Sequence, residues 1–432
     1  MFAISRKSSL CGEITVPGSK SHTIRAVLLA AMAEGRSRIT NPLTGSDGKS
    51  ALSAARAFGA KVVEEDDGAW TVYGTGGNLK VPDDVIDSGN SGTTMLFAMG
   101  MAALCEGYTV ITGDDQIRRR PVSHLVSALN EIGANAFLTR PGQEAPPVIV
   151  KGKIKGGTAH FSGFNSQAVS AILMASALGE GRVDIEIKNP LEKPYLQMTI
   201  DWMRRYGVEL SLNSKDYTRL SVEGNQSYTA CDSVIPSDWS GVAFPLVAAV
   251  CTPSQLTVSG VDFDDAQGDK IIADHLIAMG ADITKDLNRG RLIIKGGKPL
   301  KGGLTINLND TPDSFPAFSV AACYAENPVT FTGLSHVRIK ETDRVAVMEK
   351  ELTKLGAKIE TTADTMTVYG GRALTGAEVE SYGDHRIAMS LMVAGLFSCG
   401  KMKVKDAECA CVSFPGFFES MNKAGAGIEL TE

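Results

Sequence analysis

The sequence predicts an α/β (α+β) fold made of six repeats, arranged as two domains of three repeats each. A helical run that ends in Gly-Ala or Gly-Val before a short strand recurs six times. Its glycines are Gly59, Gly133, Gly207, Gly280, Gly356 and Gly425. Between these glycines, a polar turn opens a long apolar run that leads into another strand. With 432 residues, two or three domains are expected, and six repeats favour two equal sets.

The six apolar runs predict buried helices, because a helix that is apolar on all sides must be covered. Each set of repeats is therefore expected to pack around its own helical centre, with amphipathic helices and sheets outside. The turns that open these helices lie at 19–21, 90–93, 165–167, 238–240, 313–314 and 384–386. The free N–H groups at a helix start bind anions, so these turns are candidate ligand contacts.

Two chain crossings are expected between the domains, near 17–20 and near 232–238. One domain would comprise residues 19–235, and the other would comprise 1–18 with 236–432. The strand from Glu13 to Val16 is expected to pair with the last repeat and close the second domain. Two crossings at one place would form a hinge, so we expect the active site in the cleft between the domains.

Composition favours a soluble globular protein: 43% of residues are hydrophobic, 21% are charged and the net charge is −6. This balance argues against a general nucleic-acid surface. No apolar stretch reaches the roughly 18 residues of a membrane span, and the first ten residues do not resemble a signal peptide. We therefore expect a cytoplasmic monomer with no membrane or nucleic-acid partner. The eight cysteines lack C-x-x-C spacing and are interpreted as structural thiols.

Cationic side chains are concentrated in the turns. Lys20, Ser21 and Arg25 open one helix and can face one ligand, although an N-cap with solvated charges fits the same pattern. Arg120 ends a basic cluster at 118–120, which is also compatible with a surface charge run.

Acidic residues and an imidazole accompany the cations in the second half. Glu341 and Arg344 stand three residues apart at a helix start and would meet on one face, if only as a plain salt bridge. His385 and Arg386 precede an almost uncharged helix, where charges indicate function. Asp313 also precedes an apolar helix, where a simple N-cap is the alternative.

Together the turns offer an acidic chain a pocket for strongly anionic ligands. The cations are Lys20, Arg25, Arg120, Lys340, Arg344 and Arg386. Among them, Asp313, Glu341 and His385 are candidates for proton transfer. The sequence contains no Walker motif, dinucleotide loop or His/Cys metal cluster, which favours acid–base chemistry on anions without a cofactor or metal.

The motifs PGSKSxxxR, NSGTxM, RxRPxxxL, NSQ, KPYxxMT, PSDWS, DTPDS, KETDR and GDHRIAM follow in this order over essentially the whole chain. This set resembles the 5-enolpyruvylshikimate-3-phosphate synthase family. The resemblance implies a two-domain inside-out barrel of six βαβαββ units. It also implies transfer of the enolpyruvyl group from phosphoenolpyruvate to the 5-hydroxyl of shikimate 3-phosphate, with release of phosphate, on the route to chorismate.

The resemblance also implies roles for individual residues. Phosphoenolpyruvate would be held by Lys20, Gly92, Arg120, Gln167, Arg344 and Arg386. Shikimate 3-phosphate would be held by Lys20, Ser21, Arg25, Ser166, Gln167, Tyr195, Asp313 and Lys340. Asp313, Glu341 and Lys20 would share the proton transfers, and His385 would donate to Glu341 or to the leaving phosphate.

Several positions depart from the family pattern. Val412 stands where a Lys usually precedes the final Phe-Pro, and Leu96 stands where an Arg often follows the NxGTxM turn. The other departures are Asn165, Glu192 and His336. Because glyphosate carries a phosphonate and a carboxylate that the missing cations would grip, the chain is expected to tolerate it.

Two rival functions remain at this point. UDP-N-acetylglucosamine enolpyruvyl transferase shares the fold and the donor, but its mobile loop carries a reactive Cys, whereas the loop at 113–118 here has none. A six-repeat clamp around a nucleic acid would need basic residues spread evenly along repeating helices. Here the charges gather in unlike turns.

Overall fold

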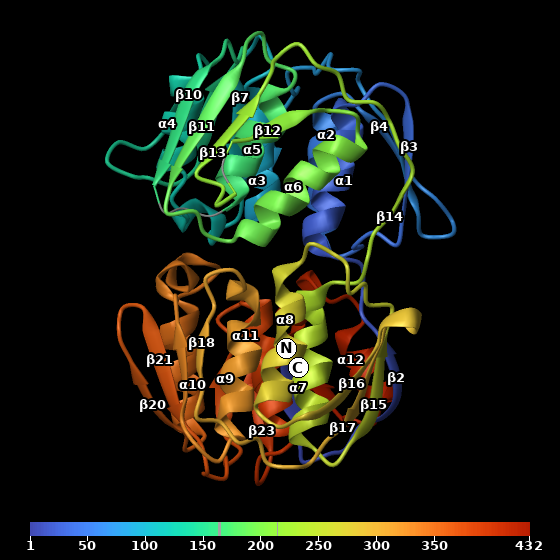
Figure 1. Ribbon diagram of the computed structural model, residues 1–432, viewed down its shortest axis with the longest axis vertical. Helices are drawn as coiled ribbons and strands as arrows, with labels where there is room; N and C mark the ends of the chain where they lie inside the picture. Colours follow the sequence, from blue (N-terminus) through green and yellow to red (C-terminus); the bar gives the residue numbers. More distant parts are fainter. Residues whose placement is uncertain (163–165, 214) are drawn as a thin grey trace. The chain divides into compact units, whose positions relative to one another are not determined.

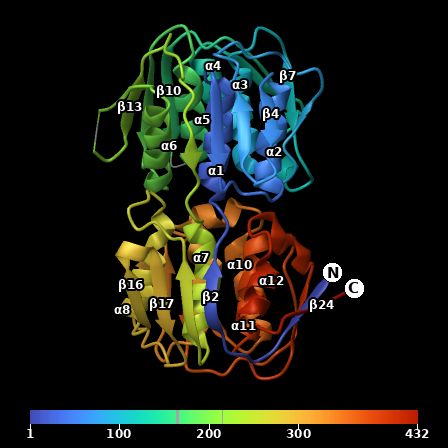
Figure 2. The same ribbon diagram turned by 90° about the vertical axis from the view of Figure 1, so that its right-hand side faces the viewer.

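The computed structural model describes residues 1–162, 166–213 and 215–432. The chain divides into two compact units (Figures 1 and 2). The central unit is Gly18–Ile235, and the terminal unit combines Met1–Pro17 with Pro236–Glu432. The chain therefore passes from one unit to the other twice, beside Pro17 and beside Pro236.

The apolar runs form the buried helices that the sequence predicts. They are α1 (Lys20–Met32), α3 (Gly92–Ala102), α5 (Ser166–Ser176), α7 (Trp239–Cys251), α9 (Phe315–Cys323) and α11 (His385–Gly395). Every residue of α3 and of α7 is buried. In the central unit α3 packs against α1 and α5, and in the terminal unit α7, α9 and α11 pack against one another. Each unit therefore has its own helical centre.

The helices of the second set are only partly buried. The set comprises α2 (Ser46–Ala57), α4 (Ser123–Glu131), α6 (Lys193–Arg205), α8 (Ile271–Ala278), α10 (Arg344–Lys354) and α12 (Phe417–Lys423). Each helix ends just before one of the six repeated glycines. The φ angles of these glycines run from +85° at Gly207 to +106° at Gly425. A residue with a Cβ rarely adopts this left-handed conformation, so glycine ends the helix and turns the chain into the next strand.

Within the described residues, six four-stranded sheets flank the helices. In the third repeat, β10 (Gly157–Ser162) pairs in parallel with β11 (Val183–Lys188). β13 (Arg219–Val222) then pairs antiparallel with both β11 and β12 (Leu210–Leu212). The order β10, α5, β11, α6, β12, β13 is a βαβαββ unit. Within each unit of the chain, the sheets lie outside the buried helices (Figure 2), as in an inside-out barrel.

The same pattern recurs along the chain. The remaining central strands are β3 (Arg36–Thr40), β4 (Lys61–Glu64), β5 (Trp70–Tyr73), β6 (Ile86–Asp87), β7 (Thr109–Thr112), β8 (Asn135–Leu138), β9 (Val148–Lys151) and β14 (Ser233–Val234). The terminal strands after α7 are β15 (Gln255–Ser259), β16 (Asp282–Asp286), β17 (Arg291–Lys295), β18 (Thr305–Asn307), β19 (Val329–Thr332), β20 (Lys358–Thr361), β21 (Thr365–Tyr369), β22 (Glu378–Glu380), β23 (Met402–Lys405) and β24 (Glu429–Thr431).

The N-terminal segment forms two strands that join different repeats, so the predicted pairing of Glu13–Val16 with the last repeat is wrong. β2 (Cys11–Thr15) pairs in parallel with β15 of the fourth repeat. β1 (Phe2–Ser5) lies antiparallel between β23 and β24 of the last repeat. The end of β2 is tied to the start of α7, because Val16 O accepts the Ser237 hydroxyl at 3.0 Å and Pro17 O accepts the Asp238 N–H at 2.9 Å. β2 is therefore the first strand of the fourth repeat.

Among the described helices, none combines the length and the apolar character that crossing a membrane requires.

Candidate active site

The terminal unit holds a buried cluster of charges around Arg344, the first residue of α10. The guanidinium is 1% exposed and reaches three carboxylates. Nε donates to Asp384 Oδ2 at 2.8 Å, Nη1 donates to Asp313 Oδ1 at 2.8 Å, and Nη2 donates to Glu341 Oε2 at 2.5 Å. Burial lowers the pKa of Arg344, but the three carboxylates outweigh this effect and hold that pKa above its ordinary value. The cation is therefore fixed in charge and position.

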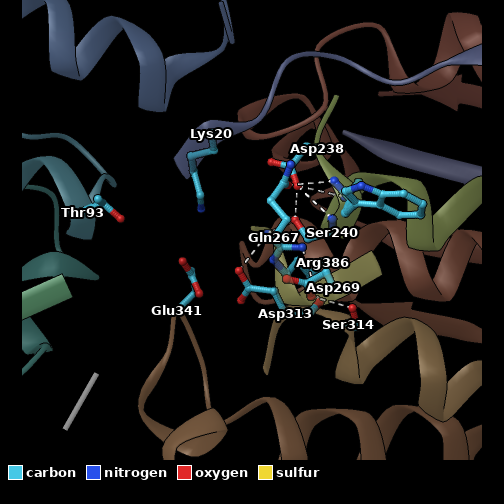
Figure 3. A network of polar contacts seen from close by, with 12 residues as sticks. Lys20, Thr93, Asp238, Ser240, Gln267, Asp269, Asp313, Ser314, Glu341 and Arg386 are labelled. Carbon is cyan, nitrogen blue, oxygen red and sulfur yellow. Dashed lines mark hydrogen bonds and ion pairs between the residues drawn. The ribbon is translucent and has the colours of Figure 1, made fainter. Parts of the chain in front are cut away.

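Arg386 belongs to the same network, near the start of α11. Its Nη2 lies 3.1 Å from Asp313 Oδ2 and donates to Ser240 Oγ at 3.0 Å. The Ser240 hydroxyl in turn donates to Asp238, the N-cap of α7 (Figure 3). Asp384 caps α11 by accepting the Arg386 N–H at 2.9 Å. Asp313 therefore bridges two buried guanidinium groups.

Local structure explains why Asp313 points to these arginines. It lies in the short 3₁₀ helix η4 (Pro312–Ser314), directly before α9. Ser314 Oγ donates to the buried Asp269 carboxylate at 2.6 Å, which anchors this turn (Figure 3). As a result, side chains from the starts of α7, α9, α10 and α11 share one hydrogen-bonded network.

Solvent exposure separates the three carboxylates around Arg344. The Asp384 side chain is 0% exposed, whereas Glu341 is 9% and Asp313 is 21% exposed. Asp384 serves as a cap and a counterion inside the protein. Only Glu341 and Asp313 of these three present accessible carboxylate surface, so they are the ones able to exchange protons with a ligand.

The other predicted residues of this unit lie in the same turns. His385 is the first residue of α11 and is 2% exposed. Lys340 is half-buried and follows the 3₁₀ helix η5 (Ser335–Ile339), next to Glu341. His336 lies within η5 and is 6% exposed.

In the central unit, Lys20, Ser21 and Arg25 lie in the first turns of α1. Lys20 Nζ lies 3.6 Å from Asp47 Oδ2. Arg25 is 1% exposed; its Nε donates to Thr199 Oγ1 at 2.8 Å and its Nη1 donates to Ser21 O at 2.9 Å. Burial lowers the pKa of Arg25 to about 10. Since this value is still far above neutrality, Arg25 stays a cation.

A second group of predicted residues surrounds the start of α3. Gly92 is its first residue, and Gln167 Nε2 donates to Thr93 Oγ1 at 2.8 Å. Arg120 follows the 3₁₀ helix η1 (Ile117–Arg119), and its Nη1 would lie only 2.6 Å from a Cβ placed on Gly92. Glycine at position 92 therefore leaves room for the guanidinium beside the start of α3, and a Cβ there would push the end of the Arg120 side chain aside.

A third group lies where α5 and α6 begin. Glu192, the N-cap of α6, accepts the Ser166 N–H at 3.1 Å and the Ser166 hydroxyl at 2.9 Å through Oε2. Tyr195 stands in the first turn of α6, and its carbonyl accepts Arg25 Nη2 at 3.3 Å. Asn165, which precedes Ser166, lies outside the described residues.

The two positions that lack a family cation differ in their surroundings. Leu96 is 4% exposed within α3, where it belongs to the apolar core. Val412 is half-buried and ends the 3₁₀ helix η6 (Ala407–Val412). A cation is therefore easier to restore at Val412 than at Leu96, because burying a charge without a partner is costly.

Sequence reasoning missed several partners of the predicted residues. Asp384 and Ser240 stand in turns that the sequence singles out. Asp384 is the N-cap of α11, whereas Ser240 lies two residues after Asp238, the N-cap of α7. Asp47 and Thr199 contact Lys20 and Arg25 from other helices, and no local pattern indicates them.

Comparison with known proteins identifies the family. Residues 4–421 match the family model of EPSP synthase (3-phosphoshikimate 1-carboxyvinyltransferase). A 3-phosphoshikimate 1-carboxyvinyltransferase of Ruminiclostridium cellulolyticum is 41% identical over 430 residues, with 100% of each chain covered. One from Acetivibrio thermocellus is 41% identical over 427 residues, with 99% of each chain covered.

Solved structures agree with the sequence relatives. An EPSP synthase from Acinetobacter baumannii superimposes with a TM-score of 0.83 at 30% identity, covering 100% of this chain and 99% of that one. The six repeats, the clustered turns and these similarities lead to one conclusion. The chain belongs to the EPSP synthase (3-phosphoshikimate 1-carboxyvinyltransferase) family.

Proposed function

We propose that this chain transfers the enolpyruvyl group of phosphoenolpyruvate to the 5-hydroxyl of shikimate 3-phosphate and releases phosphate. Family membership supports the reaction. The observation that supports the chemistry best is the network of Arg344, Arg386, Asp313 and Glu341, in which two fixed guanidinium groups accompany two accessible carboxylates. Such a network can hold an anionic substrate and move a proton without a bound cofactor.

The donor is held through its phosphate and carboxylate. Arg344 and Arg386 are buried cations suited to binding such groups. In the central unit the donor contacts are Lys20, the backbone of Gly92, Arg120 and Gln167. The contact of Arg120 with Gly92 at the start of α3, where free N–H groups favour anions, supports this assignment.

The acceptor is held by a second set of residues: Lys20, Ser21, Arg25, Ser166, Gln167, Tyr195, Asp313 and Lys340. Within this set Arg25 is bound to the Ser21 and Tyr195 carbonyls, so three of its members already form one rigid group. Rigid placement favours reaction because these side chains lose little conformational entropy when the substrate binds.

Two proton transfers form an intermediate, and further transfers convert it into the product. Asp313 takes the proton of the acceptor's 5-hydroxyl as its oxygen bonds to C2 of phosphoenolpyruvate, and Glu341 protonates the vinyl CH₂. The result is a tetrahedral ketal phosphate. Glu341 then takes a proton back from the new methyl group as the C–O bond to phosphate breaks. The proton that Asp313 took from the hydroxyl passes to the leaving phosphate, which departs as HPO₄²⁻ and restores the Asp313 carboxylate. Lys20 neutralises that phosphate, and His385 donates a hydrogen bond to it or to Glu341.

A competition assay tests the reaction. Phosphate release from phosphoenolpyruvate is measured with shikimate 3-phosphate, shikimate and UDP-N-acetylglucosamine as alternative acceptors. We expect the highest kcat/KM with shikimate 3-phosphate. Faster release with the UDP-sugar would overturn the proposal and assign the chain to the other enolpyruvyl transferase.

We further propose that the chain acts as a cytoplasmic monomer. All eight cysteines lie in the described part of the chain and are free thiols, including the exposed Cys11, Cys399 and Cys411. Exposed thiols persist in reducing compartments. Light scattering after size exclusion is expected to give the 45.7 kDa mass of one chain.

The Gly92→Ala variant is expected to raise the KM for phosphoenolpyruvate about tenfold, because its Cβ would displace Arg120 and weaken a charge-assisted hydrogen bond worth about 1.5–3 kcal/mol. Steady-state kinetics with both substrates measure this effect. In an Arg120→Ala background, the same substitution is expected to change the KM less than threefold. Equal effects in both backgrounds would show that Gly92 does not act through Arg120.

The ratio of glyphosate Ki to phosphoenolpyruvate KM is expected to be high in this chain and to fall about tenfold in Val412→Lys. The physical reason is the added charge-assisted hydrogen bond to the phosphonate or carboxylate of the inhibitor, worth about 1.5–3 kcal/mol. Val412→Met is the matched control, since it adds length without charge. A low ratio that Val412→Lys leaves unchanged would contradict the argument from a missing cation.

A further inference from the structure

We propose that Glu192 is a specificity-determining residue that competes with the phosphate of the acceptor for Ser166. The inference rests on the proposed function, in which Ser166 and Arg25 bind shikimate 3-phosphate. Glu192 places an anion of the chain itself at the position where the phosphate of the acceptor has to bind.

The contacts of Glu192 are those of an anion at a helix start. Its Oε2 accepts both the N–H and the hydroxyl of Ser166, the first residue of α5, at 3.1 and 2.9 Å. An N–H in the first turn has no partner inside its own helix, and an anion such as a carboxylate or a phosphate is a favourable ligand for such donors. Glu192 is 2% exposed and Ser166 is 1% exposed, so this contact is not a loose surface pair.

The backbone holds Glu192 in this contact. Its φ of +53° and ψ of +39° lie in the left-handed region, which a glutamate adopts only when its surroundings fix it. The next residues begin α6, whose first turn supplies the Tyr195 carbonyl to Arg25. One short segment therefore contacts both proposed phosphate ligands: Glu192 binds Ser166, and Tyr195 binds Arg25.

Arg25 provides a second, electrostatic observation. It donates to three uncharged oxygens, those of Thr199, Ser21 and Tyr195. Burial lowers the pKa of Arg25, while Tyr195 and Glu192 act in the opposite direction. The negative charge of Glu192 therefore compensates this buried cation. An arriving phosphate meets donors that are already engaged and a carboxylate of the same sign, so Glu192 has to leave Ser166 first.

This competition affects only acceptors that carry the phosphate. Shikimate lacks that group and leaves the Glu192 contact in place. Glu192 therefore narrows the preference for shikimate 3-phosphate over shikimate. In Glu192→Ser, kcat/KM for shikimate 3-phosphate is expected to rise about tenfold, since one charge-assisted contact becomes available to the phosphate. For shikimate we expect a change below threefold.

A double-mutant cycle tests the route through Ser166. In the natural chain, Ser166→Ala is expected to raise the KM for shikimate 3-phosphate only about threefold, because displacing Glu192 offsets part of the contact that the phosphate gains with the hydroxyl. In the Glu192→Ser background, Ser166→Ala is expected to raise that KM about tenfold. Glu192→Gln keeps the size of the side chain and removes its charge. Its preference for shikimate 3-phosphate over shikimate should lie between those of the natural chain and Glu192→Ser.

Glu186→Ser is the matched control. Glu186 lies on β11 of the same unit, and its exposed carboxylate pairs with Arg219 at 3.2 Å. The substitution removes one negative charge at a site that does not contact Ser166. The ratio of kcat/KM for shikimate 3-phosphate to kcat/KM for shikimate is expected to stay within twofold. The KM for phosphoenolpyruvate is measured throughout and should also stay within twofold in Glu192→Ser.

The outcomes are distinct. A rise in the KM for shikimate 3-phosphate in Glu192→Ser, or independent effects of Glu192 and Ser166, would overturn the inference while the proposed function stands. Absence of phosphate release with shikimate 3-phosphate in the natural chain would overturn the proposed function itself. If Glu192→Ser fails to fold, Glu192→Gln decides: an unchanged ratio of the two acceptors also overturns the inference.

Discussion

Asp313→Asn and Glu341→Gln are each expected to lower kcat by about 10²–10⁴, the usual loss when one group is removed from a proton-transfer step. Both variants keep the size of the side chain and an oxygen that can accept from Arg344. They remove the ability to take up or deliver a proton at that position. KM values for both substrates are expected to change much less than kcat.

The geometry explains why the loss should fall on kcat. Asp313 accepts from Arg344 at 2.8 Å and lies 3.1 Å from Arg386, while Glu341 accepts from Arg344 at 2.5 Å. In each variant the amide keeps one oxygen that can accept from Arg344. Asp313→Asn loses the second oxygen, which lies beside Arg386, but the bond from Arg386 to Ser240 still holds that guanidinium. The amides differ from the carboxylates in that they cannot take up and release a proton at these two accessible positions.

Asp343→Asn is the control for these variants. Asp343 caps α10 by accepting the Ala346 N–H at 2.9 Å, stands two residues from Glu341 and is absent from the Arg344 network. Asn is also a good N-cap, so kcat should stay within about twofold. If Asp313→Asn or Glu341→Gln raised only KM and left kcat unchanged, that residue would be a binding group and not a proton carrier.

Local sequence signals predict the repeated helices well. A glycine such as Gly207 or Gly425 ends its helix with a positive φ. Glycine adopts this conformation more readily than other residues, so the residue type alone predicts the helix end. Uniformly apolar runs such as α7 have only one stable location, the interior of a unit. Both signals act within a few residues, so reading them needs no knowledge of distant contacts.

Strand partners are different, because pairing is not local. The segment Glu13–Val16 reads as a strand, but nothing in it specifies β15 over the last repeat. Its partner is fixed by the ties of Val16 and Pro17 to residues more than 200 positions later. The pairing of β1 with β23 and β24 depends in the same way on the last repeat.

In the candidate site, too, the sequence predicts local features but not contacts between distant residues. Charges in helix-opening turns reveal Arg344, Arg386 and Asp313 as candidates, but not that Asp313 bridges both arginines. Glu192 is recognisable in the sequence as a negative charge beside a proposed phosphate site. Its two bonds to Ser166 emerge only when α5 and the start of α6 are brought together.

Arg344→Met is expected to lower the free energy of unfolding by about 3–5 kcal/mol, the typical cost of removing one partner from a buried ionic network. The substitution leaves Asp384, which is 0% exposed, without its 2.8 Å contact to Arg344 Nε. It also removes a cation from Asp313 and Glu341. Urea unfolding of both chains under the same conditions measures the difference.

Two further variants isolate the cause of that loss. Arg344→Met combined with Asp384→Asn is expected to recover part of the stability, because Asn still caps α11 and no buried charge is left uncompensated. Arg338→Met serves as the surface comparison. The side chains of Arg338 and its partner Asp343 are 23% and 40% exposed, so the loss should be about 1 kcal/mol or less. A cost for Arg344→Met no larger than that of Arg338→Met would mean that the network contributes little to folding, and that Arg344 is retained for binding anions alone.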